Sequence, residues 1–459
     1  MIDLSHLKGR RYGVFGLGRT GMAAVKALVA GGAEVLAWDD TASQRQAAED
    51  AGAELADFAT APLNYLEAIV WSPGAPFLAP KPLPAAMAAR RAGVPLISDI
   101  QLLLDAAPEV TFVGITGSNG KSTTTALIAH ILDVAGCANA VGGNLGPPTL
   151  GLETLGAGGV YVLELSSYQL ELTPSPRFNI ALLLNLEPDH LERHGGLHTY
   201  GAIKRTIFNG QPEGSMAIVG VDDAHGRWLE ARLANATPVS AGTETPARVY
   251  ADETTLFDDG TPVFTFKDAR ALGGAHNRQN AAAAYAACRA LGIATADIAS
   301  GLTSFPGLPH RQELAATLGQ VRYVNDSKAT NASAAARALA SFDRIYWIAG
   351  GLAKDGGVSG IEPWLNRIQK AYLIGEAAPA FARQLALMAP SMPVAQSGDV
   401  LSALNAAHRD AQADPATSVV LLSPACASFD QFPSYEARGD AFRVAAQRLS
   451  QPQPRGAAA

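Results

Sequence analysis

The chain has 459 residues, of which 48% are hydrophobic and 17% are charged, and at about 150 residues per domain this length predicts three packed domains. It carries 35 Lys and Arg against 42 Asp and Glu, a net charge of −7, which argues against nonspecific nucleic-acid binding as its main role. No uninterrupted apolar stretch reaches the roughly 18 residues that span a bilayer, so we expect no membrane insertion, and the three cysteines suit reduced thiols in the cytoplasm.

The first predicted unit is a strand, a glycine turn, a helix and a second strand within residues 11–40. Gly16, Gly18 and Gly21 form the G-x-G-x-x-G pattern of dinucleotide-binding units, and Asp39 follows at the end of the second strand. Taken alone, this pattern favours an NAD-dependent oxidoreductase. A glycine turn at a helix N-terminus binds any diphosphate, however, so a different nucleotide ligand stays open.

A phosphate-binding loop is predicted in residues 110–125, VTFVGITGSNGKSTTT, where a buried strand runs through a turn of small residues into a helix. In such a loop the turn amides and the helix N-terminus bind an anion, Lys121 reaches the terminal phosphates and Ser122 ligates Mg²⁺. The standard G-x-x-x-x-G-K-[ST] pattern needs glycine at position 115, where this chain has Ile115. We therefore predict a phosphate loop with nonstandard glycine spacing.

Three polar residues of the central segment are candidates for a metal or substrate site. Glu164 interrupts the strand predicted in residues 159–171, and an acid is unfavourable there unless it is paired or bound to metal. His190 follows the next apolar run. A lone histidine at a strand end is usually structural, but beside the loop and the buried acid it favours a Mg²⁺ ligand. Lys204 lies in a predicted amphipathic helix, residues 199–209, and by itself reads as a solvated lysine.

The remaining chain continues as α/β structure. A hairpin is predicted to turn at Asp259-Gly260, an Ala-rich helix covers residues 273–292, and SFPGLPHR in residues 304–311 is typical of a linker. The last third of the chain contains three strand-to-helix stretches, and each places polar residues at a strand end. The sequence therefore predicts an α/β fold of three successive units.

Several separated segments together resemble the Mur ligases. They are TGSNGKST (116–123), LELSSYQLE (163–171), DH (189–190), HNRQN (276–280), GLPHR (307–311), NDSKATN (325–331) and SPACASFDQF (423–432). The family's ATP loop has the pattern TGxxGKS[T], which accounts for Ile115.

The resemblance implies three domains. These are an N-terminal Rossmann-like domain for the UDP-sugar (1–99), a central P-loop ATPase-type domain with a mostly parallel sheet (100–307), and a C-terminal Rossmann-like domain for the amino acid (308–459). It also implies an ATP-dependent amide ligase of cell-wall synthesis that adds D-glutamate to UDP-N-acetylmuramoyl-L-alanine through an acyl phosphate and a tetrahedral intermediate. We expect a cytoplasmic monomer that uses ATP and Mg²⁺ and carries a carbamate on Lys204.

The resemblance also assigns roles to individual positions. Lys121, His190, Lys204 and Lys328 would be catalytic, and ATP would contact Gly117, Asn119, Gly120, Lys121, Ser122, Thr123, Asn277, Arg311 and Asp326. Metal would bind Ser122, Glu164, His190 and carbamylated Lys204. The UDP-substrate would contact Gly18, Arg19, Thr20, Asp39, Gly74 and Asn144, and D-glutamate would contact Lys328, Thr330, Lys354, Ser428 and Tyr435.

Three alternatives explain less of the chain. A folylpolyglutamate synthase leaves the N-terminal unit without a role, and an NAD-dependent dehydrogenase leaves the phosphate loop, NDSKATN and the third unit unexplained. A non-enzymatic nucleotide-binding scaffold is disfavoured because so many polar residues converge on strand ends.

Overall fold

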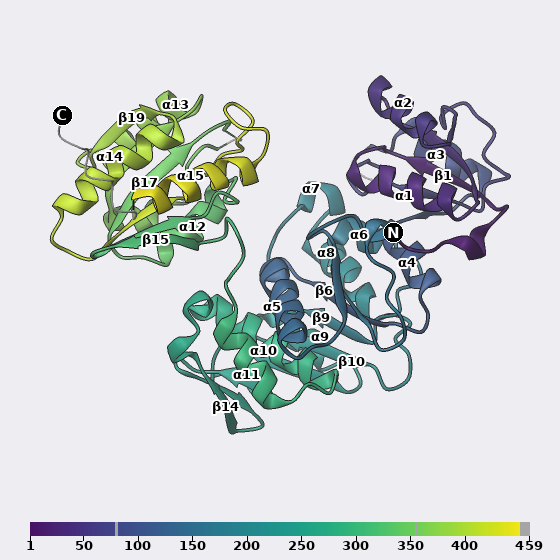
Figure 1. Ribbon diagram of the computed structural model, residues 1–459, viewed down its shortest axis with the longest axis horizontal. Helices are drawn as coiled ribbons and strands as arrows, with labels where there is room; N and C mark the ends of the chain where they lie inside the picture. Colours follow the sequence, from purple (N-terminus) through teal and green to yellow (C-terminus); the bar gives the residue numbers. More distant parts are fainter. Residues whose placement is uncertain (79–80, 354–355, 450–459) are drawn as a thin grey trace, which may run out of the picture. The chain divides into compact units, whose positions relative to one another are not determined.

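The computed structural model describes residues 1–78, 81–353 and 356–449, without the side chains of Arg270, Ala275 and His276. The chain divides into two compact units, residues 1–306 and 307–459, and contains three sheets (Figure 1). The first two sheets belong to the first unit and the third sheet to the second. The predicted boundary near residue 99 stays a prediction. No helix of the described residues is long and apolar enough to cross a membrane.

The N-terminal sheet is fully parallel, with strand order β3-β2-β1-β4-β5. Its strands are β1 (Arg11–Phe15), β2 (Glu34–Trp38), β3 (Glu54–Leu55), β4 (Ala68–Trp71) and β5 (Leu96–Ile97), and its helices are α1 (Arg19–Ala30), α2 (Ala42–Asp50) and α3 (Pro84–Ala92). The glycine turn lies between β1 and α1, as predicted, because the chain must reverse there before the helix packs on the sheet.

The central sheet has nine strands in the order β14-β13-β12-β11-β10-β9-β6-β8-β7, parallel except for its β12-β13-β14 edge. The strands are β6 (Thr111–Thr116), β7 (Asn139–Gly143), β8 (Val160–Glu164), β9 (Ile180–Leu183), β10 (Met216–Gly220), β11 (Ala236–Ser240), β12 (Val249–Ala251), β13 (Thr255–Asp258) and β14 (Thr261–Thr265). The helices are α4 (Asp99–Ala106), α5 (Lys121–Val134), α6 (Ser167–Glu171), α7 (Leu191–His194), α8 (Leu197–Arg205), α9 (Ala224–Glu230), α10 (Ala275–Ala290) and α11 (Thr295–Ser304).

Helices α5, α10 and α11 pack together on one face of this sheet (Figure 1). Because helices cover the sheet, its inner strands are near-continuous apolar runs, and all five residues of β8 are buried. The predicted hairpin is confirmed as β13 and β14, with Asp259 and Gly260 at positive φ in the turn.

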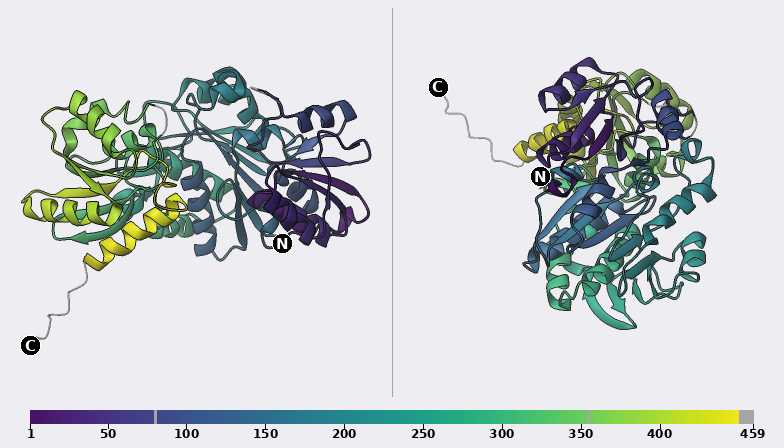
Figure 2. Two further views of the ribbon diagram at one scale, coloured as in Figure 1. Left: turned by 90° about the horizontal axis from the view of Figure 1, so that it is seen from above. Right: turned by 90° about the vertical axis from the view of Figure 1, so that its right-hand side faces the viewer.

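The C-terminal sheet has strand order β15-β16-β20-β17-β18-β19, and only β15 is antiparallel to its neighbour. Helices α12 and α13 pack on one face, while α14 and α15 lie side by side on the other (Figure 2). The strands are β15 (Glu313–Leu318), β16 (Val321–Asn325), β17 (Ile345–Gly350), β18 (Ile368–Ile374), β19 (Val394–Gly398) and β20 (Ser418–Leu422), and the helices are α12 (Ala332–Ala340), α13 (Ala378–Met388), α14 (Val400–Ala413) and α15 (Tyr435–Leu449).

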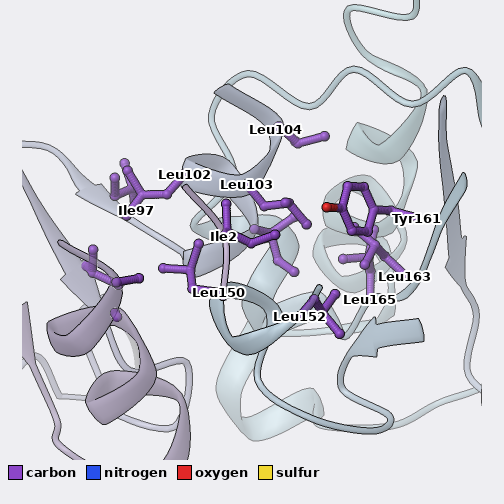
Figure 3. Packing of buried hydrophobic residues seen from close by; sticks show 14 of the residues in the cluster. Ile2, Ile97, Leu102, Leu103, Leu104, Leu150, Leu152, Tyr161, Leu163 and Leu165 are labelled. Carbon is purple, nitrogen blue, oxygen red and sulfur yellow. The ribbon is translucent and has the colours of Figure 1, made fainter. Parts of the chain in front are cut away.

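One hydrophobic core is shared by the N-terminal and central sheets. Figure 3 shows Ile2 and Ile97 close to Leu150 and to residues of α4, with Tyr161 and Leu163 of the central sheet in the same cluster. The Ile2 amide also donates to the Leu150 carbonyl at 3.0 Å. The two sheets therefore form one packed body, which fixes the N-terminal glycine turn relative to the phosphate loop.

Leu150→Ala should lower the free energy of unfolding by about 2–5 kcal/mol, because the side chain is fully buried and its loss leaves a cavity. Since the core is shared, amide hydrogen exchange should accelerate in both β1–β5 and β6–β9. Leu387→Ala, at a position that is 84% exposed, is the control and should change stability little. Faster exchange in only one of the two sheets would contradict a common core.

Candidate functional site

The phosphate loop connects the end of β6 to the start of α5. Gly117 and Gly120 have φ values of 152° and 81°, which disfavour any side chain. A Cβ at Gly120 would also lie 2.2 Å from Asn280 Oδ1. Ile115, by contrast, is still inside β6, and its fully buried side chain belongs to the core under α5. Position 115 therefore serves the core of the strand and is not part of the turn, which is why it needs no glycine.

Two lysines donate to one carbonyl oxygen of this loop. Lys121 Nζ lies 2.8 Å and Lys204 Nζ 2.9 Å from the Gly117 oxygen. Lys204 is 1% exposed, bonds Thr116 Oγ1 at 3.3 Å and lies 4.6 Å from the centroid of the Tyr200 ring. Burial, and next the charge of Lys121, lowers the pKa of Lys204 to about 6. Lys204 therefore loses its proton far more readily than the solvated lysine that its helix pattern suggested.

Glu164 is the last residue of β8 and is 2% exposed. Its Oε1 accepts a hydrogen bond from Asn144 Nδ2 at 2.8 Å, whereas its Oε2 is buried with no hydrogen-bond partner among the described residues. A buried carboxylate oxygen without a partner is unfavourable, and a cation would satisfy it. Within the described part of the chain, no three or more His, Cys, Asp or Glu side chains form a metal-binding group. An Mg²⁺ ion at Glu164 would thus need hydroxyl, carbamate or substrate oxygens to complete its ligands.

His190 precedes α7 in a left-handed conformation, with φ of 51°. Its side chain is 48% exposed, its Nε2 lies 3.5 Å from Asp189 Oδ2, and its ring meets the Tyr168 ring edge-on at 5.1 Å. This backbone conformation is uncommon for a residue with a side chain and is enriched at functional sites.

An open pocket of about 360 Å³ brings several predicted site residues together. It combines predicted catalytic residues of the central sheet with predicted UDP-substrate residues from both sheets. Its lining residues are Pro73, Gly74, Lys121, Asn144, Ser166, Ser167, Tyr168, Asp189, His190, Tyr200 and Lys204. The predicted residues Ser122 and Glu164 are buried beside it and are not in its lining.

The N-terminal glycine turn is held by Asp39. Its Oδ2 accepts from the Leu17 amide at 2.7 Å and its Oδ1 from the Thr41 amide at 2.8 Å. Burial alone would raise the pKa of Asp39, but these backbone donors outweigh it and keep the pKa below its usual value. Gly18 caps α1, and Arg19 and Thr20 are its first residues, so this helix N-terminus presents amides to an anion.

The phosphate loop and the start of α5 are also held by hydrogen bonds from residues that the sequence did not single out. Thr124 Oγ1 donates to Asn280 Oδ1 at 3.2 Å, and Asn280 Nδ2 donates to Asn277 Oδ1 at 3.2 Å. Asn185 Oδ1 accepts from the Asn119 amide at 2.8 Å. The second asparagine of HNRQN was the only available signal for Asn280. Thr123, the remaining predicted loop residue, is half-buried on α5.

The second unit carries the other predicted residues. Asp326 follows β16, accepts from Ser423 Oγ at 2.8 Å and from the Gln312 amide at 3.2 Å, and burial raises its pKa to about 7. Lys328 Nζ lies 5.4 Å from the centroid of the Tyr435 ring. Arg311 is exposed, Thr330 is half-buried and Ser428 is buried. Lys354 lies outside the described residues.

Comparison with known proteins identifies the family. The chain is 50% identical to the UDP-N-acetylmuramoylalanine–D-glutamate ligase of Phenylobacterium zucineum over 98% of each chain. This chain belongs to the Mur ligases. The Mur ligase middle domain matches residues 115–288. The ligase of the same name from Rhizobium meliloti is 46% identical over 96% of this chain and 97% of that protein.

Solved structures agree on the fold. The UDP-N-acetylmuramate-alanine ligase of Thermotoga maritima matches with a TM-score of 0.58 at 17% identity, over 96% of this chain and 100% of that one. The three-domain α/β fold of the Mur ligases is therefore confirmed for this chain.

Asp326→Asn should remove a specific pH dependence of stability. Asp326 keeps its proton in the folded state up to a pKa of about 7, whereas it ionises near 3.8 when unfolded. The folded protein thus binds the extra proton between these values, and stability falls as pH rises from about 4 to 7. Asparagine does not titrate; its oxygen can accept from the Gln312 amide, and its amide nitrogen can donate to Ser423 Oγ. The free energy of unfolding, measured with denaturant between about pH 4 and 7, should fall less in the variant than in the wild type. An equal fall in both proteins would contradict the assignment.

Proposed function

We propose that the chain adds D-glutamate to UDP-N-acetylmuramoyl-L-alanine at the expense of ATP, in peptidoglycan precursor synthesis. The observation that carries this proposal is the identity of 46–50% to ligases of that name along nearly the whole chain. The geometry supports it, because one pocket combines Lys121, His190 and Lys204 with Gly74 and Asn144. A dehydrogenase would leave this pocket without a role.

The chemistry requires activation of a carboxylate. The L-alanyl carboxylate takes the γ-phosphoryl group of ATP, the amine of D-glutamate attacks the acyl phosphate, and phosphate leaves the tetrahedral intermediate. Two anions must approach each other in the first step, so cationic groups have to offset their repulsion. Lys121 serves this role at the N-terminus of α5, where its ammonium group exchanges the Gly117 and Ser118 carbonyls for phosphate oxygens.

Mg²⁺ is the proposed cofactor, and it would supply Lewis-acid stabilisation of the phosphate oxygens. Ser122, Glu164, His190 and modified Lys204 would hold it. The partnerless Oε2 of Glu164 supports this set, as does the polar character of the surrounding side chains.

Lys204 is proposed to carry a carbamate. Only the unprotonated amine attacks CO₂, and the lowered pKa of Lys204 supplies that form at neutral pH. The modification puts an anion next to the charged Lys121 in place of the Lys204 amine, and the two opposite charges attract each other. A carbamate also provides the oxygen ligands that the described acidic residues do not.

The remaining roles follow the sequence expectations. Gly18, Arg19, Thr20 and Asp39 would bind the UDP-substrate at the first glycine turn, while Asn277, Arg311 and Asp326 would contact ATP. Lys328, Thr330, Ser428 and Tyr435 would hold D-glutamate, and we propose that the enzyme acts as a monomer in the cytoplasm.

Phosphate release from ATP tests the activity. It should require both UDP-N-acetylmuramoyl-L-alanine and D-glutamate, because only the complete pair consumes the acyl phosphate. The acceptor panel should contain D-glutamate, L-glutamate and meso-diaminopimelate. Equal release with L-glutamate or meso-diaminopimelate would reject the assigned acceptor.

Lys204→Ala should lose activity by several orders of magnitude, because the site then lacks the carbamate anion that would hold Mg²⁺. Bicarbonate should not restore the variant, since no amine remains to be modified, whereas a short-chain carboxylic acid such as acetate should restore part of the rate. Lys26→Ala, at an exposed position of α1, is the control. Full activity of Lys204→Ala without additives would refute the carbamate role.

A further inference from the structure

Arg193, on α7, contacts both the N-terminal and the central part of the first unit. Its guanidinium carbon lies 4.9 Å from the centroid of the Phe77 ring and 5.5 Å from that of the Tyr168 ring. Its Nη2 donates to Glu171 Oε2 at 2.8 Å, and the Arg193 and Glu171 side chains are each only 10% exposed. Cation–π contacts and ion pairs strengthen when they are shielded from water, so these three contacts hold Arg193 in one place.

These contacts reach the pocket from two sides. Tyr168 lines the pocket, and its ring also packs against His190. Phe77 follows three residues after Gly74, which lines the pocket from the N-terminal loop. Neither Arg193 nor Phe77 lines it. Arg193 therefore acts on the pocket through its neighbours and does not meet a bound molecule there itself.

Glu171 and His194 lie between Arg193 and the pocket lining. Glu171 Oε1 lies 3.4 Å from His194 Nδ1 without a hydrogen bond between them, and His194 Nε2 is hydrogen-bonded to Ser167 Oγ at 2.9 Å. Ser167 lines the pocket, and both Ser167 and His194 are buried. The loop of Phe77 is thus connected through Arg193 and Glu171 to the same wall that holds Tyr168.

We propose that Arg193 is a positioning residue for the UDP-substrate, which fixes the loop of Gly74 and Phe77 against the wall that carries Tyr168 and Ser167. This inference rests on the proposed function, in which the substrate extends from the first glycine turn to the phosphate loop. A substrate that contacts both sheets needs the loop of Gly74 and Phe77 at a fixed distance from Tyr168 and Ser167. ATP does not span them, so its binding is independent of Arg193.

The test compares the variants Arg193→Met and Phe77→Leu with Arg232→Met as the matched control. Arg232 makes the same kind of contact, 4.4 Å from the Trp228 ring, away from the pocket lining. Both test variants should raise the KM for UDP-N-acetylmuramoyl-L-alanine about tenfold, equal to about 1.4 kcal/mol, while the KM for ATP stays unchanged. Arg232→Met should leave both values as in the wild type.

A purely structural role would give a different result. It would lower the thermal midpoint and the active fraction, and hence kcat, without a selective change of one KM. Because Arg193→Met leaves Glu171 buried without its partner, Arg193→Met/Glu171→Gln is measured as well and should show the same KM increase.

A double-mutant cycle tests whether Phe77 and Arg193 act as one unit. The Phe77→Leu/Arg193→Met double variant should bind UDP-N-acetylmuramoyl-L-alanine no more weakly than either single variant, since either change already frees the loop. Independent effects that multiply would overturn the proposal, and so would unchanged affinities. Calorimetry without ATP or D-glutamate gives these affinities without turnover. A wild type that binds this substrate but does not transfer D-glutamate would reject the proposed function while the cycle still decides the role of Arg193.

Discussion

The site depends on one carbonyl oxygen, that of Gly117, which accepts hydrogen bonds from both Lys121 and Lys204. Gly117 has a φ of 152°, which only glycine adopts easily. Two amines that share an acceptor in a buried site cannot both stay protonated without strong repulsion. Burial first, and next the charge of Lys121, lowers the pKa of Lys204 to about 6, so the loop has a cation at Lys121 beside an amine at Lys204 that gives up its proton readily.

Much of the site was predictable from sequence because its signals are local. The strand, turn and helix of the phosphate loop occupy one continuous segment, and Glu164 is recognisable because an acid ends an otherwise apolar strand. The environment of Lys204 was not predictable. Its helix is amphipathic, and its buried side chain donates to Thr116, 88 residues earlier in the chain, a long-range contact that no local pattern signals.

The same limit applies to the residues that support the site. Asn280 and Thr124 are 156 residues apart, and Arg193 meets Phe77 across the two sheets, so no local pattern connects either pair. The G-x-G-x-x-G turn shows the converse limit. Its local pattern is clear, yet it fits a UDP-substrate and NAD equally well, because it specifies only amides that face an anion. Its acid, Asp39, already accepts hydrogen bonds from the Leu17 amide of the turn and from the Thr41 amide.

The core shared by Ile2, Ile97 and Leu150 also affects how the chain is made. During synthesis Ile2, α1 and Ile97 leave the ribosome before Leu150 and Tyr161 exist, so the apolar surface that these residues form has no partner until the central segment emerges. A chain interrupted before β8 would keep that surface exposed and be open to aggregation and proteolysis.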